Sequence, residues 1–331
     1  MVWSTNQITA LKQHTTMSRT KIEARCVVDK LKVCYIQPPH LFNRLAEECG
    51  ILNDDCRESY YIDCGDFSLQ LIDKIGKDGN YTQLDFAVII PADNYSKLGT
   101  FTFSNSGKYE GKAFFEFENS ALYTTFSKLP QGTNNYQCLL FYVTSTLGLE
   151  YNNITQVEIA LDTTKNYIKH LRSYIHNYKQ YDMFLNGKIV KDESATLENY
   201  GEYYSRSRMS MSKQPTLYFG QSKDVGLKMR VYNKSIELAE QSKQKADRYS
   251  EFVEFSTNTQ IYRVEVVVRN TDIKLFHSLW REHFGKDDAE NILALLMSEQ
   301  FNVQLWKWAT DRLVYFRDKQ TKDYIYLSDI L

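Results

Sequence analysis

The sequence predicts an α+β fold, a mainly antiparallel sheet with helices packed on one face. Short segments in which apolar and polar residues alternate recur along the 331 residues, and single segments with apolar residues three and four positions apart separate them. A glycine-containing turn at 106–111 joins two of the alternating segments in the manner of a hairpin. Strand pairs separated by single helices are typical of α+β proteins.

Local signals predict each element. The segment 27–36 reads as a strand, and 84–90 is a strand that ends at Pro91, because proline cannot donate a hydrogen bond to a neighbouring strand. The helix at 38–50 is closed by a glycine, and the helix at 165–178 has apolar and tyrosine side chains three and four positions apart. The remaining predicted strands are 100–104, 113–117, 156–162, 216–220, 228–232 and 262–269, and the remaining helices are 138–147, 273–284 and 289–301.

The order of elements roughly repeats itself after residue 150, which allows two similar halves. Only 5 prolines and 14 glycines occur, so we expect a mostly ordered chain. The expected organisation is an N-terminal tail at 1–20, a central domain at 21–270 with halves near 21–150 and 151–270, and a C-terminal helical closing segment at 271–331.

Charge is unevenly distributed although the formal net charge is only -1. The segment 44–66 has two basic and seven acidic residues, whereas 203–248 has ten basic and four acidic residues. A polarised chain can bind a polyanion on one face despite a neutral total. The alternative is a solvated basic face without a partner.

The cysteines and the apolar pattern indicate the compartment. Six cysteines occur with no Cys-x-x-Cys pair and no hydrophobic signal segment before them, so we expect reduced, mainly structural thiols. No run of about 18 apolar residues is present, as a membrane-spanning helix would need. We expect a cytoplasmic protein that does not span a membrane.

One strand presents a tyrosine among cations. Side chains alternate between the two faces of a strand, so one face of 228–234 carries Tyr232 together with Lys228, Arg230 and Lys234. Cations compensate charge on an attacked phosphate and favour the phenolate form of a tyrosine, so this face suits phosphoryl transfer. The alternative is an ordinary exposed strand face.

Carboxylates occupy strand positions that a buried strand would fill with apolar residues. Glu158 and Asp162 share a face of 156–162, and Glu265 lies on the polar face of 262–269. A further carboxylate, Glu116 or Glu118, follows the predicted hairpin. Carboxylates that converge from adjacent strands favour a hard cation such as Mg²⁺ or Mn²⁺. The alternative is cross-strand ion pairing, for example of Glu265 with an arginine.

Other chemistries lack their motifs. The sequence contains no P-loop, no Gly-x-Gly-x-x-Gly that opens a helix and no Gly-x-Ser-x-Gly elbow. The six histidines form neither His-x-His nor His-Glu-x-x-His, which excludes the familiar histidine-rich metal sites. Tyrosines precede Arg206 and Arg208, and aromatic residues among cations are typical of grooves for single-stranded DNA. A tyrosine-rich loop over the core is the alternative.

Taken in order, three segments resemble the Rep_trans family of rolling-circle plasmid replication initiators and conjugative-element relaxases. They are TQVEIALD at 155–162, TLYFGQSKDVGLKMRVYNK at 216–234 and YRVEVVVR at 262–269. The family typically shows an acidic-x-Ala-x-Asp strand, a Tyr-x-Gly hairpin that runs into Arg-x-Tyr-x-Lys, and an Arg-x-Glu strand that ends in Arg. VVDKLKVCY and FFEFENSALY resemble its first strand and following hairpin, so the similarity spans most of 27–270.

The resemblance implies a strand-nicking enzyme whose catalytic domain is 21–270. It implies a metal-dependent nick in single-stranded or cruciform origin DNA, in which a tyrosine keeps the 5′ phosphate and the 3′ hydroxyl primes a polymerase. A recruited host helicase and a homodimer are further implied. The implied catalytic residues are Tyr232, Lys234 and Arg230; the DNA-binding residues are Lys228, Lys223, Arg206, Arg208, Tyr218 and Arg269; and the metal ligands are Asp162, Glu265, Glu158 and Glu116.

Two other functions fit part of the sequence. A non-catalytic origin or promoter regulator on the same sheet would use the basic segment 203–248 and bind DNA without a metal. A structural or protein-interaction domain would fit the acidic segment 44–66 and the low net charge.

Overall fold

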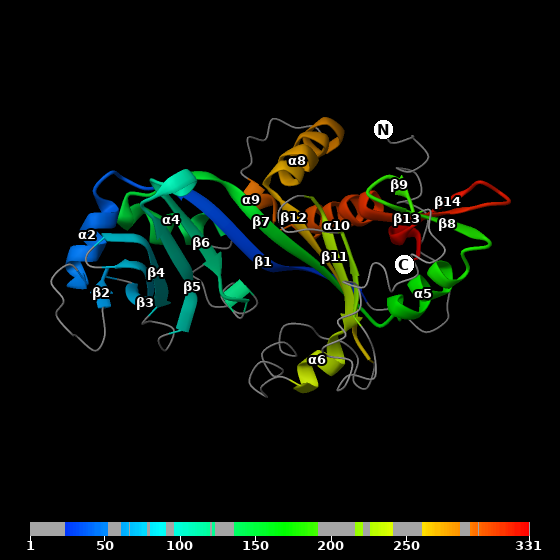
Figure 1. Cartoon of the computed structure of the whole chain (residues 1–331), viewed down its shortest axis with the longest axis horizontal. Helices are drawn as coiled ribbons and strands as arrows, with labels where there is room; N and C mark the ends of the chain where they lie inside the picture. The colour runs from blue at the N-terminus through cyan, green and yellow to red at the C-terminus, as the bar shows by residue number, and fades with distance from the viewer. Residues whose placement is uncertain are drawn as a thin grey trace.

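The computed structural model describes residues 24–51, 61–65, 67–77, 80–90, 96–119, 121–122, 136–190, 216–220, 226–240, 260–284, 292–296 and 298–330, and Figure 1 shows the whole chain. The expected N-terminal tail at 1–20 lies outside these residues. Within them, no helix is long and apolar enough to cross a membrane.

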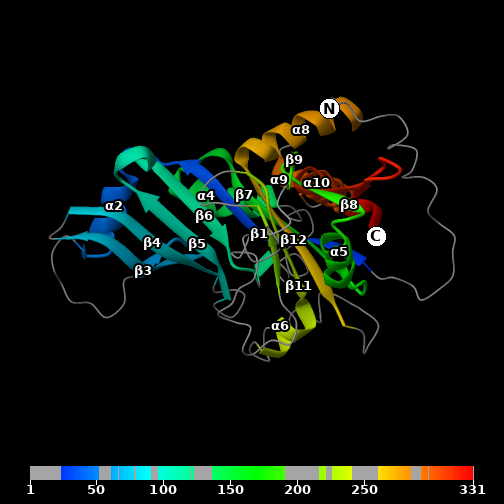
Figure 2. The same cartoon turned by 45° about the vertical axis from the view of Figure 1, so that its right-hand side comes forward.

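A ten-stranded antiparallel sheet dominates the fold, as the α+β prediction required (Figures 1 and 2). Its strands lie in the order β10-β11-β12-β7-β1-β6-β5-β4-β3-β2. Their bounds are β1 Ala24–Ile36, β2 Tyr61–Asp63, β3 Ser68–Lys77, β4 Asn80–Ile90, β5 Ser96–Ser104, β6 Lys112–Phe117, β7 Glu150–Thr163, β10 Leu217–Phe219, β11 Lys228–Asn233 and β12 Tyr262–Arg269.

The two long strands β1 and β7 lie side by side at the centre and organise the two halves. The last strand of the first half, β6, pairs with β1, and the last strand of the second half, β12, pairs with β7. The next strand outward is β5 on one side and β11 on the other. The same arrangement on both sides of the β1–β7 pair is what two similar halves predict.

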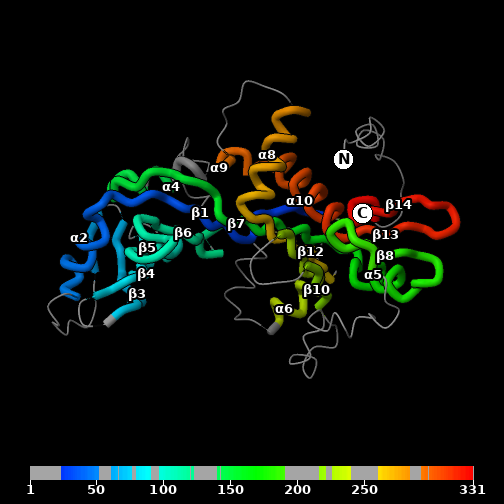
Figure 3. Tube along the Cα trace, turned by 45° about the horizontal axis from the view of Figure 1, so that its top comes forward, coloured from blue at the N-terminus to red at the C-terminus, as the bar shows by residue number. Residues whose placement is uncertain are grey.

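Helices cover one face of the central strands. α8 (Asn270–Phe284) and α10 (Glu299–Leu313) pack on β7 and β12, and both lie on the same side of the sheet in Figure 3. Val264, Val266 and Val268 alternate along β12 towards this side and are fully buried, and Trp306 Nε1 of α10 donates to the Val264 carbonyl at 3.0 Å. Burial of these apolar side chains fixes which face of β12 remains for polar residues.

The other helices have the bounds η4 Gly107–Tyr109, α2 Leu41–Glu48, α4 Tyr136–Leu147, α5 Tyr167–His176, α6 Lys234–Glu240, α9 Ile292–Leu295 and η6 Leu327–Ile330. Side-chain caps start two helices: Asn166 accepts from the Lys169 amide in α5, and Ser298 accepts from the Phe301 amide in α10. The spacing of apolar residues predicted α5, whereas the helix predicted at 289–301 corresponds to α9 and only the first turn of α10, which continues to Leu313.

The C-terminal segment is not helical throughout. After α10 the chain forms β13 (Val314–Asp318) and β14 (Tyr324–Tyr326), which make a second sheet with β8 (Tyr181–Leu185) and β9 (Lys188–Ile189). Aromatic side chains stabilise this sheet across its strands, for example Phe184 stacked on Tyr315 with ring centroids 4.8 Å apart. The sequence prediction of a C-terminal helical closing segment did not include these strands, because β13 pairs with β8, more than a hundred residues earlier, and β14 is only three residues long.

Candidate metal centre and tyrosine site

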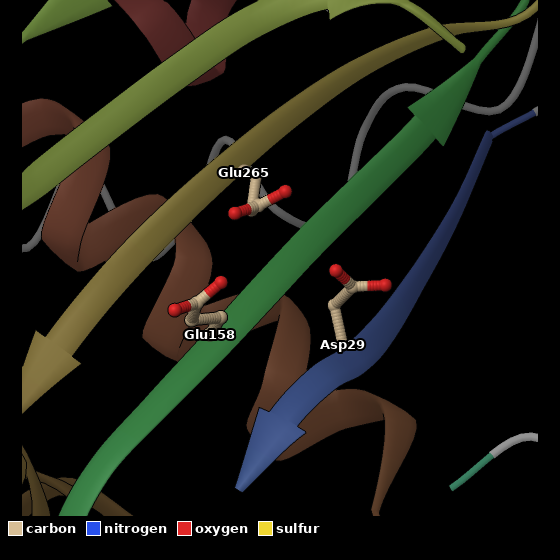
Figure 4. A group of neighbouring side chains, drawn as sticks. All are labelled: Asp29, Glu158 and Glu265. Atoms are coloured by element: carbon tan, nitrogen blue, oxygen red, sulfur yellow. The ribbon is translucent and has the colours of Figure 1, made fainter. Parts of the chain in front are cut away.

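Three neighbouring strands bring three carboxyl groups together on the face of the sheet opposite α8 and α10. Asp29 extends from β1, Glu158 from β7 and Glu265 from β12, as Figure 4 shows. One oxygen of each lies within 4.8 Å of the others. Oxygen atoms at this spacing fit the ligand shell of a hard divalent cation such as Mg²⁺ or Mn²⁺. Two of the three, Glu158 and Glu265, are residues that the strand spacing had singled out.

A β-bulge places Asp29. The register of β1 against β7 runs from Val28 opposite Ile159 to Lys30 opposite Glu158, so Asp29 is an extra residue without a partner position. A bulge re-aims side chains and is often found beside functional sites. Strict alternation would put Asp29 in the apolar row of Leu31. An acidic residue in that row was the signal in the sequence, and the sequence analysis missed it.

Arg230 and Tyr232 of β11 both reach Glu265. Arg230 Nε donates to Glu265 Oε1 at 3.1 Å, and Arg230 Nη2 donates to the same oxygen. The Tyr232 hydroxyl donates to the other carboxylate oxygen, Oε2, at 3.3 Å. Arg230 Nη2 also lies 3.8 Å from Glu158 Oε2. The Tyr232 hydroxyl is therefore hydrogen-bonded to one of the three carboxylates. Glu265 also forms the cross-strand pair with an arginine that the sequence had left as an alternative.

Asp162, which the sequence analysis proposed as a metal ligand, lies elsewhere on this face. Its oxygens accept from Arg263 Nε at 2.6 Å and Arg263 Nη2 at 2.7 Å, and both side chains are fully buried. Arg263 Nη1 donates in turn to Asp29 Oδ1 at 2.5 Å. Among the described residues, Asp162 does not belong to the set of three carboxylates that could hold a metal ion. Its position opposite Arg263 in the strand register explains the difference.

Glu116 is also separate from the three carboxyl groups. It lies on β6, one strand beyond β1, where its oxygens are 2.6 Å from Lys30 Nζ and 3.5 Å from Lys32 Nζ. The sequence had offered Glu116 or Glu118 as a further carboxylate of the predicted hairpin, and spacing along the chain could not show that β1 lies between Glu116 and Glu158. The alternative residue, Glu118, pairs with Lys97 at 3.3 Å.

The protonation of Glu158 indicates that the site suits a cation. Burial, a hydrogen bond with Glu265 and the charge of Glu265 raise the pKa of Glu158 to about 8. Two carboxyl groups that lie so close avoid double ionisation unless a cation compensates them. Four carboxyl groups in this region face two guanidinium groups: Asp29, Glu158, Asp162 and Glu265 against Arg230 and Arg263. The carboxyls of this set outnumber the guanidinium groups by two, and the nearby ammonium groups of Lys30 and Lys234 are already paired with Glu116 and Glu237.

Cation binding should therefore release a proton. Glu158 is protonated below a pKa of about 8 and must ionise to become a ligand, so the affinity for Mn²⁺ should be highest above that pH and fall by up to about tenfold per pH unit below it. Isothermal titration calorimetry in buffers of different ionisation enthalpy measures the released proton. Glu158→Gln should bind Mn²⁺ more weakly and lose this pH dependence; an affinity of the wild-type chain that does not change with pH would contradict the assignment.

Tyr232 is not activated by its cations alone. Burial raises its pKa above the ordinary value, and the charges of Glu265, Glu237 and Asp29 add to this, whereas Arg263 opposes it. The sequence expectation that flanking cations favour the phenolate is therefore wrong for the metal-free chain. The main cause is burial of the Tyr232 hydroxyl, and the charges of Glu265, Glu237 and Asp29 add to it.

The other predicted catalytic and DNA-binding residues either lie near Tyr232 or fall outside the described residues. Lys234 is buried at the start of α6, forms an ion pair with Glu237 at 2.6 Å, and has its Nζ 5.8 Å from the Tyr232 ring centroid. Tyr218 lies opposite Arg230 in the register of β10 and β11, on the tyrosine face. Lys228 and Arg269 also lie on this face, in β11 and at the end of β12, whereas Arg206, Arg208 and Lys223 lie outside the described residues.

Comparisons with known proteins give one structural likeness. No family model matches the chain, and no curated protein shows significant sequence similarity. The fold is similar to that of a rolling circle replication initiator protein from Geobacillus stearothermophilus, with 14% sequence identity, a TM-score of 0.38, and coverage of 86% of this chain and 97% of that chain. Because identity and TM-score are both low, the case for function rests on the residues of the site.

Proposed function

We propose that the protein cuts and rejoins one strand of DNA, with Tyr232 as the nucleophile and a divalent cation held by Asp29, Glu158 and Glu265. The observation that carries the proposal is the 3.3 Å hydrogen bond from the Tyr232 hydroxyl to Glu265, because Glu265 belongs to the group of three carboxyls. Phosphodiester transfer through a tyrosine needs a phenol close to a bound cation, and here the phenol is hydrogen-bonded to a carboxylate of the group that could hold one.

The reaction exchanges one phosphodiester for another. The Tyr232 oxygen forms a bond to phosphorus, the bond from phosphorus to the 3′ oxygen breaks, and that oxygen leaves as a 3′ hydroxyl after taking up a proton. Glu265 Oε2 already accepts the phenolic hydrogen bond and is placed to take the proton as the tyrosine attacks. Storage of the 5′ phosphate on Tyr232 conserves the bond energy for rejoining.

The remaining residues of the site have supporting roles. A bound Mg²⁺ or Mn²⁺ would polarise the phosphate and withdraw negative charge from it. Arg230 holds Glu265 on the same side as Tyr232, and its guanidinium is available to a phosphate oxygen at the edge of the group. Arg263 holds Asp29 towards the cation position through a 2.5 Å ion pair.

The biological role follows from the sequence resemblance to Rep_trans proteins. We infer initiation of rolling-circle replication, or conjugative transfer, of a plasmid or other mobile element in the cytoplasm. The substrate would be single-stranded or cruciform origin DNA, with a host helicase as a partner and a homodimer as the assembly.

Mass spectrometry of the covalent product tests this function. The protein is incubated with Mn²⁺ and a pool of random-sequence single-stranded oligonucleotides, treated with nuclease and protease, and searched for a nucleotide-modified peptide. We expect the modification on Tyr232. A modified tyrosine elsewhere would contradict the nucleophile, and DNA binding without any covalent product would instead support the regulator that binds origin or promoter DNA without cutting it.

A further inference from the structure

The polar face of the sheet continues past the three carboxyls onto the first half of the chain. Lys30 and Lys32 of β1 lie on this face, and Lys112, Phe114 and Glu116 of β6 lie beside them, with Lys32 opposite Glu116 in the register. Lys30 is opposite Glu158, so the surface begins at the proposed metal centre. The side chains of Lys30, Lys32 and Glu116 keep about a third of their area exposed, at 30%, 32% and 36%.

Cations and aromatic rings alternate along this surface. Lys32 Nζ lies 5.7 Å from the Phe114 ring centroid, and the Phe114 ring meets the Tyr109 ring edge-on at 5.3 Å. Lys108 Nζ lies 4.8 Å from the Tyr109 ring, and Tyr109 is 45% exposed. Aromatic rings interleaved with ammonium groups are the features with which proteins stack bases and track the backbone of single-stranded nucleic acid, and here Tyr109 is exposed and Phe114 is partly buried.

Glu116 occupies the place that a phosphate would take. Its two oxygens bind the two lysines at 2.6 and 3.5 Å, so a single carboxylate neutralises both ammonium groups. A DNA phosphate carries the same single negative charge and also has two acceptor oxygens, so it would compete with Glu116 for Lys30 and Lys32. The ion pairs therefore keep the lysines ordered while DNA is absent.

We propose that this basic–aromatic surface, formed by Lys30, Lys32, Lys108, Tyr109, Lys112 and Phe114, binds the single-stranded DNA that extends from the tyrosine site. The assignment rests on the proposed function and adds the direction of the strand, from Tyr232 on β11 across β12, β7 and β1 to β6. The surface is continuous with the three carboxyls, and this favours DNA over an acidic protein as the occupant. A DNA strand that is cut at Tyr232 has to leave the site over one of the neighbouring β-strands.

Equilibrium binding of labelled oligothymidylate in the presence of EDTA tests the proposal without any cutting step. The double variant Lys108→Ala/Tyr109→Ala should bind about tenfold more weakly, because one stacked ring and one phosphate contact are lost, and the dependence of affinity on salt should become shallower. The matched control is Lys74→Ala/Tyr81→Ala, since Lys74 Nζ also lies over a tyrosine ring, at 5.0 Å, but on β3 and β4. This control should bind as the wild-type chain does.

Glu116→Gln gives a second test with the opposite sign. Removal of the competing carboxylate should tighten oligothymidylate binding several-fold, whereas Glu48→Gln, which removes a carboxylate paired with Arg44 on α2, should leave the affinity unchanged. A purely structural role of Glu116 would weaken binding or leave it unaltered. Duplex DNA of the same length should bind the wild-type chain more weakly than oligothymidylate does, because paired bases cannot stack on Tyr109 and Phe114.

The results separate this proposal from the proposed function. Equal losses in both lysine–tyrosine double variants, or no loss in either, would overturn the surface even if covalent attachment at Tyr232 is found. Selective weakening by Lys108→Ala/Tyr109→Ala with tighter binding by Glu116→Gln would support it even if no covalent product forms.

Discussion

Tyr232→Phe should lower covalent attachment to single-stranded DNA by on the order of a thousandfold or more, because the only atom removed is the attacking oxygen. The ring stays in place, so its contacts with Arg230 and Lys234, each 5.8 Å from the ring centroid, are kept. Oligothymidylate binding should change little. Denaturing gel electrophoresis of protein mixed with labelled DNA and Mn²⁺ measures the adduct.

Tyr218→Phe is the matched control for this variant. Tyr218 lies on the same face and is opposite Arg230 in the register, but it is one strand further from the three carboxyls. Tyr218 is one of the expected DNA-binding residues, but Tyr218→Phe keeps the ring that would stack on a base, so adduct formation should stay within about twofold of the wild-type rate. If Tyr232→Phe still forms the adduct, or if Tyr218→Phe loses it equally, Tyr232 is not the nucleophile.

The alternation of side chains along a strand predicted which residues share a face of the sheet at the site. It placed Arg230 and Tyr232 on one face of one strand, and Glu265 and Glu158 on the matching faces of two others. Alternation is reliable here because the opposite face of each strand is apolar and packs on helices, so a shift by one residue would bury the charges. The faces of strands β11, β12 and β7 could therefore be read from the sequence.

Alternation does not predict which residues become neighbours. Asp162 and Glu265 share a face with Arg263, but the register places Arg263 directly opposite Asp162 and leaves Glu265 opposite Ala160. Registers depend on long-range pairing, and a bulge changes the register locally, as it does at Asp29. The separation of Glu116 from the site was for this reason outside the reach of spacing arguments, whereas the acidic Asp29 in an apolar row was a signal that the sequence analysis missed.

Arg263→Met should destabilise the fold by about 3–5 kcal/mol, because it leaves two buried carboxylates without their cation. Arg263 bonds Asp162 through two nitrogens and Asp29 through the third, and the exposed fraction of its side chain is 0%. Burial alone would raise the pKa of Asp29, but Arg263 and its neighbours lower it in the native protein. Urea unfolding followed by circular dichroism measures the loss.

The pH dependence of this loss distinguishes missing charge from missing packing. Without Arg263, burial should raise the folded-state pKa of Asp29 above its unfolded value, so the penalty is present at neutral pH and shrinks as the pH falls and this carboxyl protonates. A packing defect would cost the same at every pH. The control is Arg317→Met, whose partner Asp182 lies 2.7 Å away in the second sheet, where the arginine is 31% exposed. That pair should contribute much less than the Arg263 network does, because solvent screens it. If Arg263→Met and Arg317→Met lowered the free energy of unfolding equally, the Asp162–Arg263–Asp29 network would not be what holds Asp29 beside Glu158 and Glu265.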